Sequence, residues 1–223
     1  MSHETAAEAK PTFPSAGKRI TIEWFGRAPA GRTPGILMLH GRDGPYRFAD
    51  AYRGFAAVFA HKGYSTLFPH YFEATESTSL FGREGLSNAA AWMRTVADAI
   101  DWVAGQSEID AGRLGLVGIS LGTSLALAQA ARDTRIKAVV AFYGMLPVQA
   151  TAAIRRMPPT LILHGAQDWV VPVAAAHQLD ALLQRIGAEH ELHIYPGQGH
   201  GFQGAAGRDA ARRSLHFFER HLA

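Results

Sequence analysis

The sequence LGLVGISLGTSLALA over residues 114–128 decides the fold of this chain. Its apolar start, 114–117, predicts a buried strand, and the run 123–128 predicts a helix that begins directly after it. The Gly-Ile-Ser-Leu-Gly between them has the pattern of a nucleophile elbow, in which Ser120 is held in a strained backbone conformation with its hydroxyl at the edge of a sheet. The two glycines give the strand and the helix room to pass. The alternative interpretation is an ordinary strand, turn and helix with an exposed serine.

A serine at such an elbow needs a base and an orienting acid, and in this architecture the acid and then the histidine follow the serine along the chain. Asp168 lies in a Gly-containing loop after the apolar run 159–163, which predicts a buried strand. His200 follows a predicted strand, 191–195, and a Pro-Gly-Gln-Gly break. Because ligands bind at the carboxyl ends of the strands in an open α/β sheet, we expect these three side chains to converge there.

Other acids and histidines after the serine fit these roles less well. Four other acids lie in or at the end of a predicted helix, or beside the start of a strand: Asp133, Asp180, Glu189 and Glu191. A structural role is the default for the remaining histidines: His164, His177, His190, His193, His216 and His221. His200 differs from them because it lies where the serine's base is required.

An oxyanion hole is predicted from a second loop. The apolar run 35–40 predicts a short strand, and His-Gly-Arg-Asp-Gly at 40–44 predicts the turn at its end. In this class of enzyme one backbone N–H comes from the residue after the nucleophile and another from such an upstream loop. We assign these donors to Leu121 and Arg42. Leu121 also begins a helix, whose N-terminal partial positive charge favours an oxyanion.

These motifs together resemble the α/β-hydrolase superfamily, and most closely its small dienelactone hydrolase-related branch. The resemblance runs from Lys18 to the C-terminus. It rests on these segments: Leu39-His40-Gly41, Gly118 to Gly122, Phe142-Tyr143-Gly144, His164 to Asp168, and Tyr195 to Phe202. It implies a triad of Ser120, Asp168 and His200 and an oxyanion hole of Arg42 and Leu121, in agreement with the residue-by-residue interpretation.

Two departures from that branch bear on the substrate. Dienelactone hydrolases have cysteine at the elbow and a glutamate in the upstream loop, where this chain has Ser120 and His40-Gly41-Arg42. Their arginine that holds the substrate carboxylate corresponds here to the Gln203-Gly204 region. The resemblance therefore implies the fold of this branch but not its activity. With serine as the nucleophile, the chain is more similar to general carboxylesterases.

The expected fold is a single α/β domain with a mostly parallel sheet, helices on both faces and no large cap domain. We expect residues 1–17 to form a flexible tail and residues 18–223 to form the domain. The expected strands are 18–25, 35–40, 64–68, 114–117, 136–142, 159–163 and 191–195, and the expected helices are 47–61, 88–104, 123–133, 173–186 and 205–222. The N-terminus carries no apolar signal-peptide core, which predicts a cytoplasmic protein.

Composition excludes several other classes. The 223 residues include no cysteine, which removes disulfides and thiol chemistry, and no run is long enough to span a membrane. The net charge of +3, from 22 basic and 19 acidic residues, is mild, and we expect no nucleic-acid partner. Gly199 to Gly204 matches G-x-G-x-x-G, but too little chain follows for a dinucleotide-binding unit. We expect no organic cofactor and no metal.

The predicted function is hydrolysis of small carboxylic esters through an acyl-enzyme, by a monomer or homodimer. The alternatives are a dienelactone or other lactone hydrolase, an acyl thioesterase, and a binding protein that shares the fold without catalysis. Arg42 or Arg83 is a candidate for holding a substrate carboxylate. Candidate pocket residues, each equally consistent with plain packing, are Tyr71, Phe81, Tyr143, Trp169 and Phe202.

Overall fold

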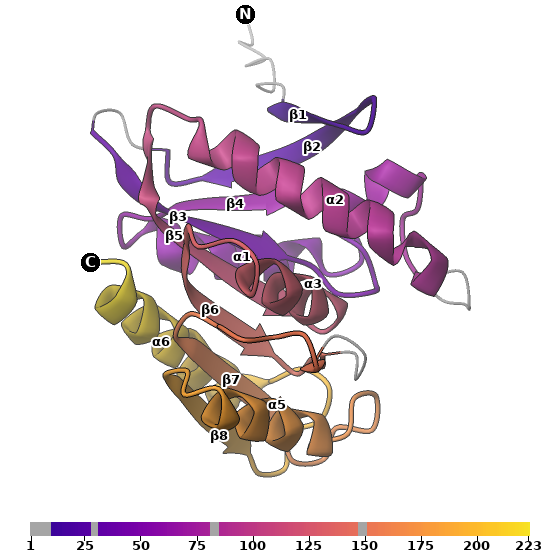
Figure 1. Cartoon of the computed structure of the whole chain (residues 1–223), viewed down its shortest axis with the longest axis vertical. Coiled ribbons are helices and arrows are strands. Elements are labelled where there is room, and N and C mark those ends of the chain that lie inside the picture. The colour runs from indigo at the N-terminus through magenta and orange to yellow at the C-terminus, as the bar shows by residue number, and fades with distance from the viewer. Residues whose placement is uncertain (1–9, 28–30, 81–84, 147–150) are drawn as a thin grey trace, which may run out of the picture.

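The computed structural model describes residues 10–27, 31–80, 85–146 and 151–223, which form one sheet with helices on both faces (Figure 1). The strand order is β1-β2-β4-β3-β5-β6-β7-β8. The strands are β1 (Thr12–Ser15), β2 (Lys18–Phe25), β3 (Thr33–Leu39), β4 (Ser65–Pro69), β5 (Ile109–Ile119), β6 (Ile136–Phe142), β7 (Thr160–Gly165) and β8 (His190–Tyr195). The helices are α1 (Ala49–Ala60), the short 3₁₀ helix η1 (Tyr71–Thr75), α2 (Gly85–Ala104), α3 (Leu121–Ala130), α5 (Ala174–Arg185) and α6 (Gly204–His221).

Six neighbouring strands of this sheet, β4, β3, β5, β6, β7 and β8, are parallel. Strand β2 is antiparallel to both of its neighbours, β1 and β4. Strand β3 lies between β4 and β5, with Leu37 opposite both Leu67 and Leu116. The parallel arrangement brings the carboxyl ends of β3, β5, β7 and β8 to one edge of the sheet. The predicted α/β fold with a mostly parallel sheet is confirmed.

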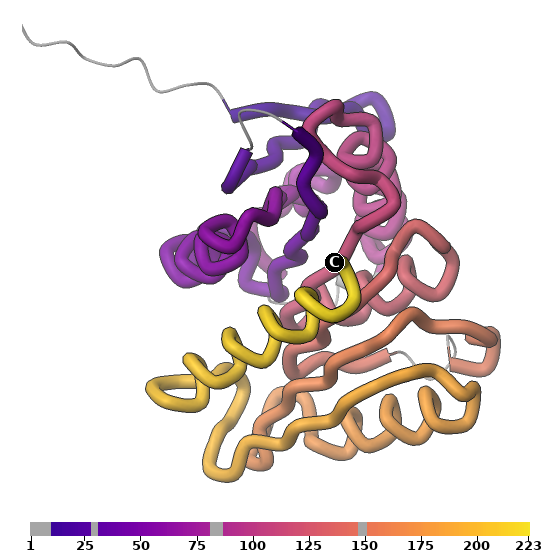
Figure 2. The backbone as a smooth tube through the Cα atoms, turned by 90° about the vertical axis from the view of Figure 1, so that its left-hand side faces the viewer, coloured from indigo at the N-terminus to yellow at the C-terminus, as the bar shows by residue number. Residues whose placement is uncertain are grey.

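Each face of the sheet has its own hydrophobic core. Helices α1 and α6 cover one face, and α2, α3 and α5 cover the other (Figure 2). On the α1 and α6 side, Phe59 and Phe218 are fully buried and pack edge to face, with ring centroids 5.6 Å apart. On the opposite side, Trp92 of α2 and Leu127 of α3 are fully buried. Strands that are covered on both faces consist of consecutive apolar residues, and for this reason they could be predicted from the sequence.

The N-terminal boundary of the domain is a correction. Residues 12–15, predicted to belong to a flexible tail over residues 1–17, form strand β1, which pairs with β2 in a hairpin. Phe13 is fully buried, so the strand is part of the core. The turn places Ala16 and Gly17 at φ 47° and 80°, the left-handed pair that a tight hairpin turn requires.

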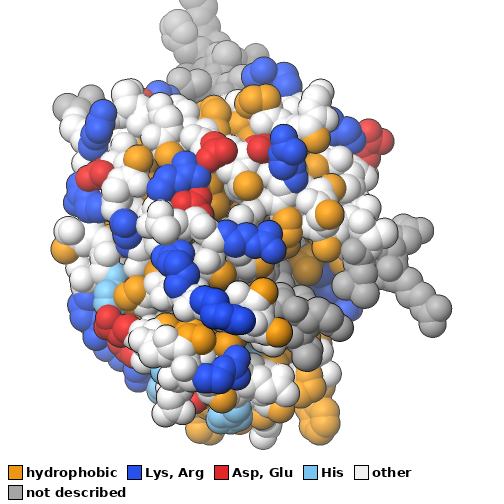
Figure 3. All heavy atoms as spheres, viewed as in Figure 1, with side chains coloured by type: hydrophobic (Ala, Val, Ile, Leu, Met, Phe, Trp, Pro, Cys, Tyr) orange, Lys and Arg blue, Asp and Glu red, His pale blue; other side chains and the backbone are white. Residues whose placement is uncertain are grey.

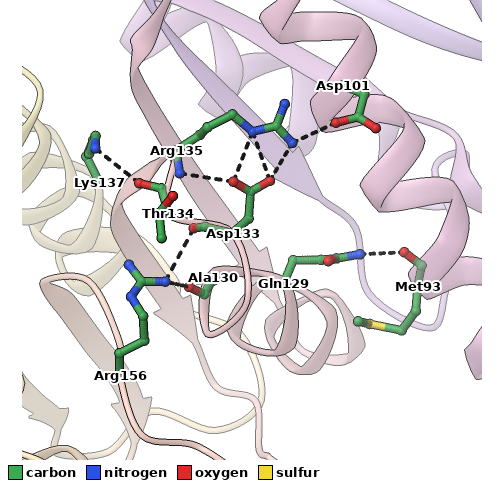
Figure 4. A network of polar contacts seen from close by, with 9 residues as sticks. All are labelled: Met93, Asp101, Gln129, Ala130, Asp133, Thr134, Arg135, Lys137 and Arg156. Carbon is green, nitrogen blue, oxygen red and sulfur yellow. Dashed lines mark hydrogen bonds and ion pairs between the residues drawn. The ribbon is translucent and has the colours of Figure 1, made fainter.

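A polar network holds the helix that follows Ser120 (Figure 4). Just after α3, Asp133 accepts hydrogen bonds from the Arg135 guanidinium, which also pairs with Asp101 of α2 at 2.6 Å. Arg156 donates to the Ala130 carbonyl at 2.8 Å. These contacts fix the C-terminal end of α3 to α2 and to the segment that leads into β7.

Basic side chains on the face drawn in Figure 3 are interspersed with acidic and hydrophobic ones. Many of the arginines have a local acidic partner, such as Arg94 with Asp98 at 3.3 Å and Arg135 with Asp133 at 2.6 Å. Part of the positive charge of the protein is therefore paired locally.

Candidate active site

The turn between β5 and α3 holds Ser120 in an unusual backbone conformation, with φ 54° and ψ −115°. A non-glycine residue at positive φ is strained and is found mainly at functional sites. The flanking glycines make this turn possible. A Cβ at Gly118 would lie 2.4 Å from Thr123 Cα, and one at Gly122 would lie 2.2 Å from the Leu39 carbonyl oxygen.

Hydrogen bonds hold this turn against its neighbouring strand. The Ser120 N–H donates to the Phe142 carbonyl at 2.9 Å. The hydroxyl of Thr123 lies 2.8 Å from the Gly118 carbonyl oxygen and 2.9 Å from that of Phe142, so it bridges both strands. Because the backbone is pinned on both sides of Ser120, the strained conformation persists.

The structure brings Ser120, His200 and Asp168 together in hydrogen-bond order. His200 Nε2 lies 2.9 Å from Ser120 Oγ, and His200 Nδ1 lies 2.8 Å from Asp168 Oδ2. A carboxylate only accepts hydrogen bonds, so Nδ1 carries the ring proton and Nε2 accepts from the serine hydroxyl. This is the geometry in which a histidine can remove a proton from a serine.

Asp168 is fixed from its other side by the loop after β7. Its side chain is fully buried, and Oδ1 accepts hydrogen bonds from the backbone N–H groups of Val170 at 2.9 Å and Val171 at 2.8 Å. His164 lies alongside: its Nε2 donates to the Val171 carbonyl at 2.9 Å and is 3.4 Å from Asp168 Oδ2. Burial lowers the pKa of His164, so this imidazole is neutral and serves to position the loop.

The loop after β3 approaches the serine from the opposite side. The Gly41 N–H donates to Tyr52 Oη at 3.1 Å, and the Arg42 carbonyl accepts from the Leu80 N–H at 2.7 Å. A Cβ at Gly41 would lie 3.4 Å from the Cβ of Ser120, which shows how near the loop is to the nucleophile. The first N–H of the loop is therefore occupied, and that of Arg42 is the next one along the chain.

His40 stabilises this loop from within the core. Its ring stacks on Tyr71 with centroids 4.0 Å apart, and the Tyr71 hydroxyl donates to the His40 carbonyl at 2.7 Å. Burial lowers the pKa of His40 to about 3, so its imidazole is neutral. Within the part of the chain that the structure describes, its buried Nε2 has no hydrogen-bond partner.

A cavity of about 610 Å³ opens beside Ser120 and His200 and extends between α1 and α6. Of the predicted pocket residues, Tyr143 and Phe202 line it. Tyr71 does not, because η1 turns its side chain into the core, where it is fully buried. The prediction that Trp169 lines the pocket is also wrong, because its side chain is 93% exposed and lies outside the cavity. Phe81 and Arg83 lie outside the described residues.

Sequence reasoning missed the part of the cavity that the helices contribute. Tyr52 and Phe55 of α1 and Gly207 and Ala210 of α6 line it. Their spacing at one helix face shows that these positions face inward, but it does not distinguish a cavity wall from a packed core. Sequence alone gave no signal for this distinction.

Two further features of the described residues are relevant here. No group of three or more His, Asp or Glu side chains among them could hold a metal ion. None of the helices in the described ranges is long and apolar enough to cross a membrane.

Residues 24–221 match the dienelactone hydrolase family. The chain belongs to this family. A carboxymethylenebutenolidase from Rhodococcus opacus is 28% identical over 201 residues, which cover 77% of this chain and 76% of that protein. Alignments with relatives from Methylorubrum extorquens and Yersinia pestis, 29% and 27% identical, cover 39% and 48% of those proteins, so the chain spans about half or less of their length.

Solved structures of similar fold include other members of this family. Dienelactone hydrolase from Anabaena variabilis superposes with a TM-score of 0.74 at 21% identity, over 97% of this chain and 99% of that one. The metagenomic P91, described as a dienelactone hydrolase-like promiscuous phosphotriesterase, superposes with a TM-score of 0.79 at 18% identity, over 96% and 98% of the two chains. At these identities the similarity establishes the fold, and the predicted resemblance to the dienelactone hydrolase branch of the α/β hydrolases is confirmed.

Proposed function

We propose that this protein is a serine hydrolase that cleaves small carboxylic esters through an acyl-enzyme intermediate. The observation that carries the proposal is the chain of contacts from Ser120 Oγ to His200 Nε2 at 2.9 Å and from His200 Nδ1 to the buried Asp168 at 2.8 Å. A serine hydroxyl is a weak nucleophile until an adjacent base takes its proton, and this contact supplies the base.

In the proposed mechanism His200 accepts the hydroxyl proton as Ser120 Oγ attacks the ester carbonyl carbon. The tetrahedral intermediate collapses, the C–O bond to the alcohol breaks, and the imidazolium returns the proton to the departing alkoxide. Water, deprotonated by His200, then attacks the acyl-enzyme and releases the acid. Asp168 orients the imidazole and stabilises its charged form, and it stays ionised throughout.

The oxyanion of each tetrahedral intermediate would bind backbone N–H groups on either side of Ser120. Leu121 begins α3, so its N–H lies at the positive end of the helix dipole. The second proposed donor is Arg42, because the preceding N–H, that of Gly41, donates to Tyr52 Oη. Backbone donors of this kind typically contribute about 10²- to 10³-fold to kcat each.

Lactone hydrolysis is the second candidate function. The relative from Rhodococcus opacus is named for a butenolide, which is an unsaturated lactone. The same attack by Ser120 would open a lactone ring, with the leaving alkoxide still tethered to the acyl group. A substrate panel that holds esters, thioesters and lactones of similar size separates these possibilities.

Turnover of such a panel by matched serine variants tests the proposal. Ser120→Ala should lower kcat by roughly 10⁴- to 10⁶-fold, because the members of a triad act as a unit. Ser124→Ala, one turn further along α3, is the control and should keep wild-type kcat, since its hydroxyl donates to the Met145 carbonyl. Retention of most activity in Ser120→Ala would exclude the mechanism.

A further inference from the structure

Where α6 borders the space between it and α1, its first turns present only small side chains. Gly207, Ala210 and Ala211 stand at positions i, i+3 and i+4, so they share one helix face, and all three line the cavity. Its volume of about 610 Å³ falls within the roughly 300–1,000 Å³ of typical small-molecule sites. The cavity can therefore hold a substituent much larger than an acetyl group.

Aromatic rings form a continuous wall from the candidate catalytic histidine to α1. His200 contacts Tyr143 with centroids 4.8 Å apart, Tyr143 contacts Phe202 edge to face at 5.2 Å, and Phe202 contacts Phe142 at 6.0 Å. Phe142 meets Phe55 of α1 edge to face at 5.4 Å. Such rings present edges and faces on which another aromatic ring packs favourably.

The described side chains that line this cavity carry a negative formal charge. Asp43 is the only carboxylate among its lining residues, all of which lie in the described ranges, and no lysine or arginine lines it. Asp43 forms a long ion pair with Arg47, whose Nε is 3.9 Å from Asp43 Oδ1 and whose side chain is 60% exposed and is not among the lining residues. Arg42 is also exposed.

An anionic substituent would meet two costs in this cavity. It would lose its hydration among aromatic rings, and a buried charge without a partner is expensive. It would also approach Asp43, and like charges near a protein surface repel by an amount that depends on their distance and screening. An uncharged aryl group meets neither cost.

We propose that this cavity binds an uncharged aryl or similarly bulky apolar group of the substrate, and that Asp43 selects against carboxylated esters. This inference rests on the proposed ester hydrolysis at Ser120 and specifies its substrate class. It assigns specificity to two features that the sequence pattern did not indicate, the Asp43 carboxylate and the small-residue face of α6.

Two substrates with the same aryl acetate, one neutral and one anionic, test the role of Asp43 when acetate release is measured. Methyl 3-acetoxybenzoate is neutral and 3-acetoxybenzoate is anionic, and both carry the same scissile acetate. Wild-type enzyme should favour the neutral ester in kcat/KM by at least about tenfold, and Asp43→Asn should reduce this ratio severalfold. The matched control Asp98→Asn, on the surface of α2, should leave the ratio unchanged.

A second variant tests the cavity itself. Ala211→Phe should lower kcat/KM for methyl 3-acetoxybenzoate relative to that for methyl acetate by about tenfold or more, because the added ring fills the space between the helices. Ala205→Phe, at an exposed position of α6 outside the cavity, should not change this ratio.

The outcomes separate this inference from the proposed function. An equal or greater preference for the anionic ester in the wild type, or unchanged ratios in both Asp43→Asn and Ala211→Phe, overturns the inference while ester hydrolysis stands. If Ala211→Phe does not fold, the Asp43→Asn ratio alone decides. If wild-type enzyme hydrolyses no ester and Ser120 takes no label from a fluorophosphonate, the proposed function fails, and this inference with it.

Discussion

Replacing Asp168 with asparagine should place the ring proton of His200 on the wrong nitrogen. Oδ1 of Asp168 accepts hydrogen bonds from two backbone N–H groups, at 2.9 and 2.8 Å. In Asp168→Asn the amide oxygen must stay on that side, because an NH₂ group there would face two donors. The NH₂ group then points at His200 Nδ1, which must accept. The ring proton therefore moves to Nε2, 2.9 Å from Ser120 Oγ, where it blocks proton transfer from the serine.

A histidine held in this tautomer cannot act as the base, and the comparable change in another serine hydrolase lowers kcat by about 10⁴-fold. This corresponds to about 5.5 kcal/mol of activation free energy. We expect this loss in kcat for a 4-nitrophenyl ester, with the thermal unfolding midpoint as a test of folding. The control Asp180→Asn removes a carboxylate in α5 that pairs with His190 at the start of β8, and it should keep full activity. A folded Asp168→Asn with kcat within tenfold of wild type would refute the reasoning.

Three further predictions concern stability. Gly122→Ala places a Cβ 2.2 Å from a β3 carbonyl oxygen, so it should destabilise the protein by more than the roughly 1–3 kcal/mol of ordinary overpacking. Gly54→Ala, in open space on α1, should stabilise the protein by about 0.5–1 kcal/mol. Chemical denaturation measures the free energy of unfolding of both variants. Glu23→Gln breaks a buried ion-pair cluster and should cost about 3 kcal/mol, whereas Glu76→Gln, at an exposed ion pair, should leave stability almost unchanged. Equal effects of the two changes would contradict the buried role of Glu23. The pKa of His40 is about 3 in the folded protein and about 6.5 when unfolded, so the unfolded chain takes up the extra proton between these values. Stability should therefore fall as the pH drops from 7 to 5, by up to about 1.4 kcal/mol per unit from this group, and His40→Phe should flatten the slope in urea unfolding.

The strands of this fold were predictable because parallel strands covered on both faces are continuous apolar runs. The exception is β1, in which Phe13 is the one large apolar side chain and stands between Thr12 and Pro14. The sequence feature that could have indicated β1 is Ala16-Gly17, because glycine after a residue with a small side chain is suited to a tight hairpin turn. Helix α2 begins at Gly85, three residues before its predicted start.

The candidate catalytic residues were predictable because each follows a strand, so topology alone brings them to one edge. Cavity residues were not, because whether an aromatic side chain points into the core or into the cavity depends on tertiary packing. Tyr71 and Trp169 show both failures: the 3₁₀ turn of η1 carries the first into the core, and the loop after β7 leaves the second in solvent. In the sequence, the three small residues of α6 are equally typical of a helix that packs closely against a neighbouring helix.

The identity of the nucleophile is the central claim, and covalent labelling tests it most directly. Wild-type protein, Ser120→Ala and Ser124→Ala would be treated with a fluorophosphonate, analysed by intact mass and then mapped by peptide sequencing. The account predicts a single adduct on Ser120 in the wild type and in Ser124→Ala, and none in folded Ser120→Ala. An adduct on another residue, or an unlabelled wild-type protein that is folded, would contradict it.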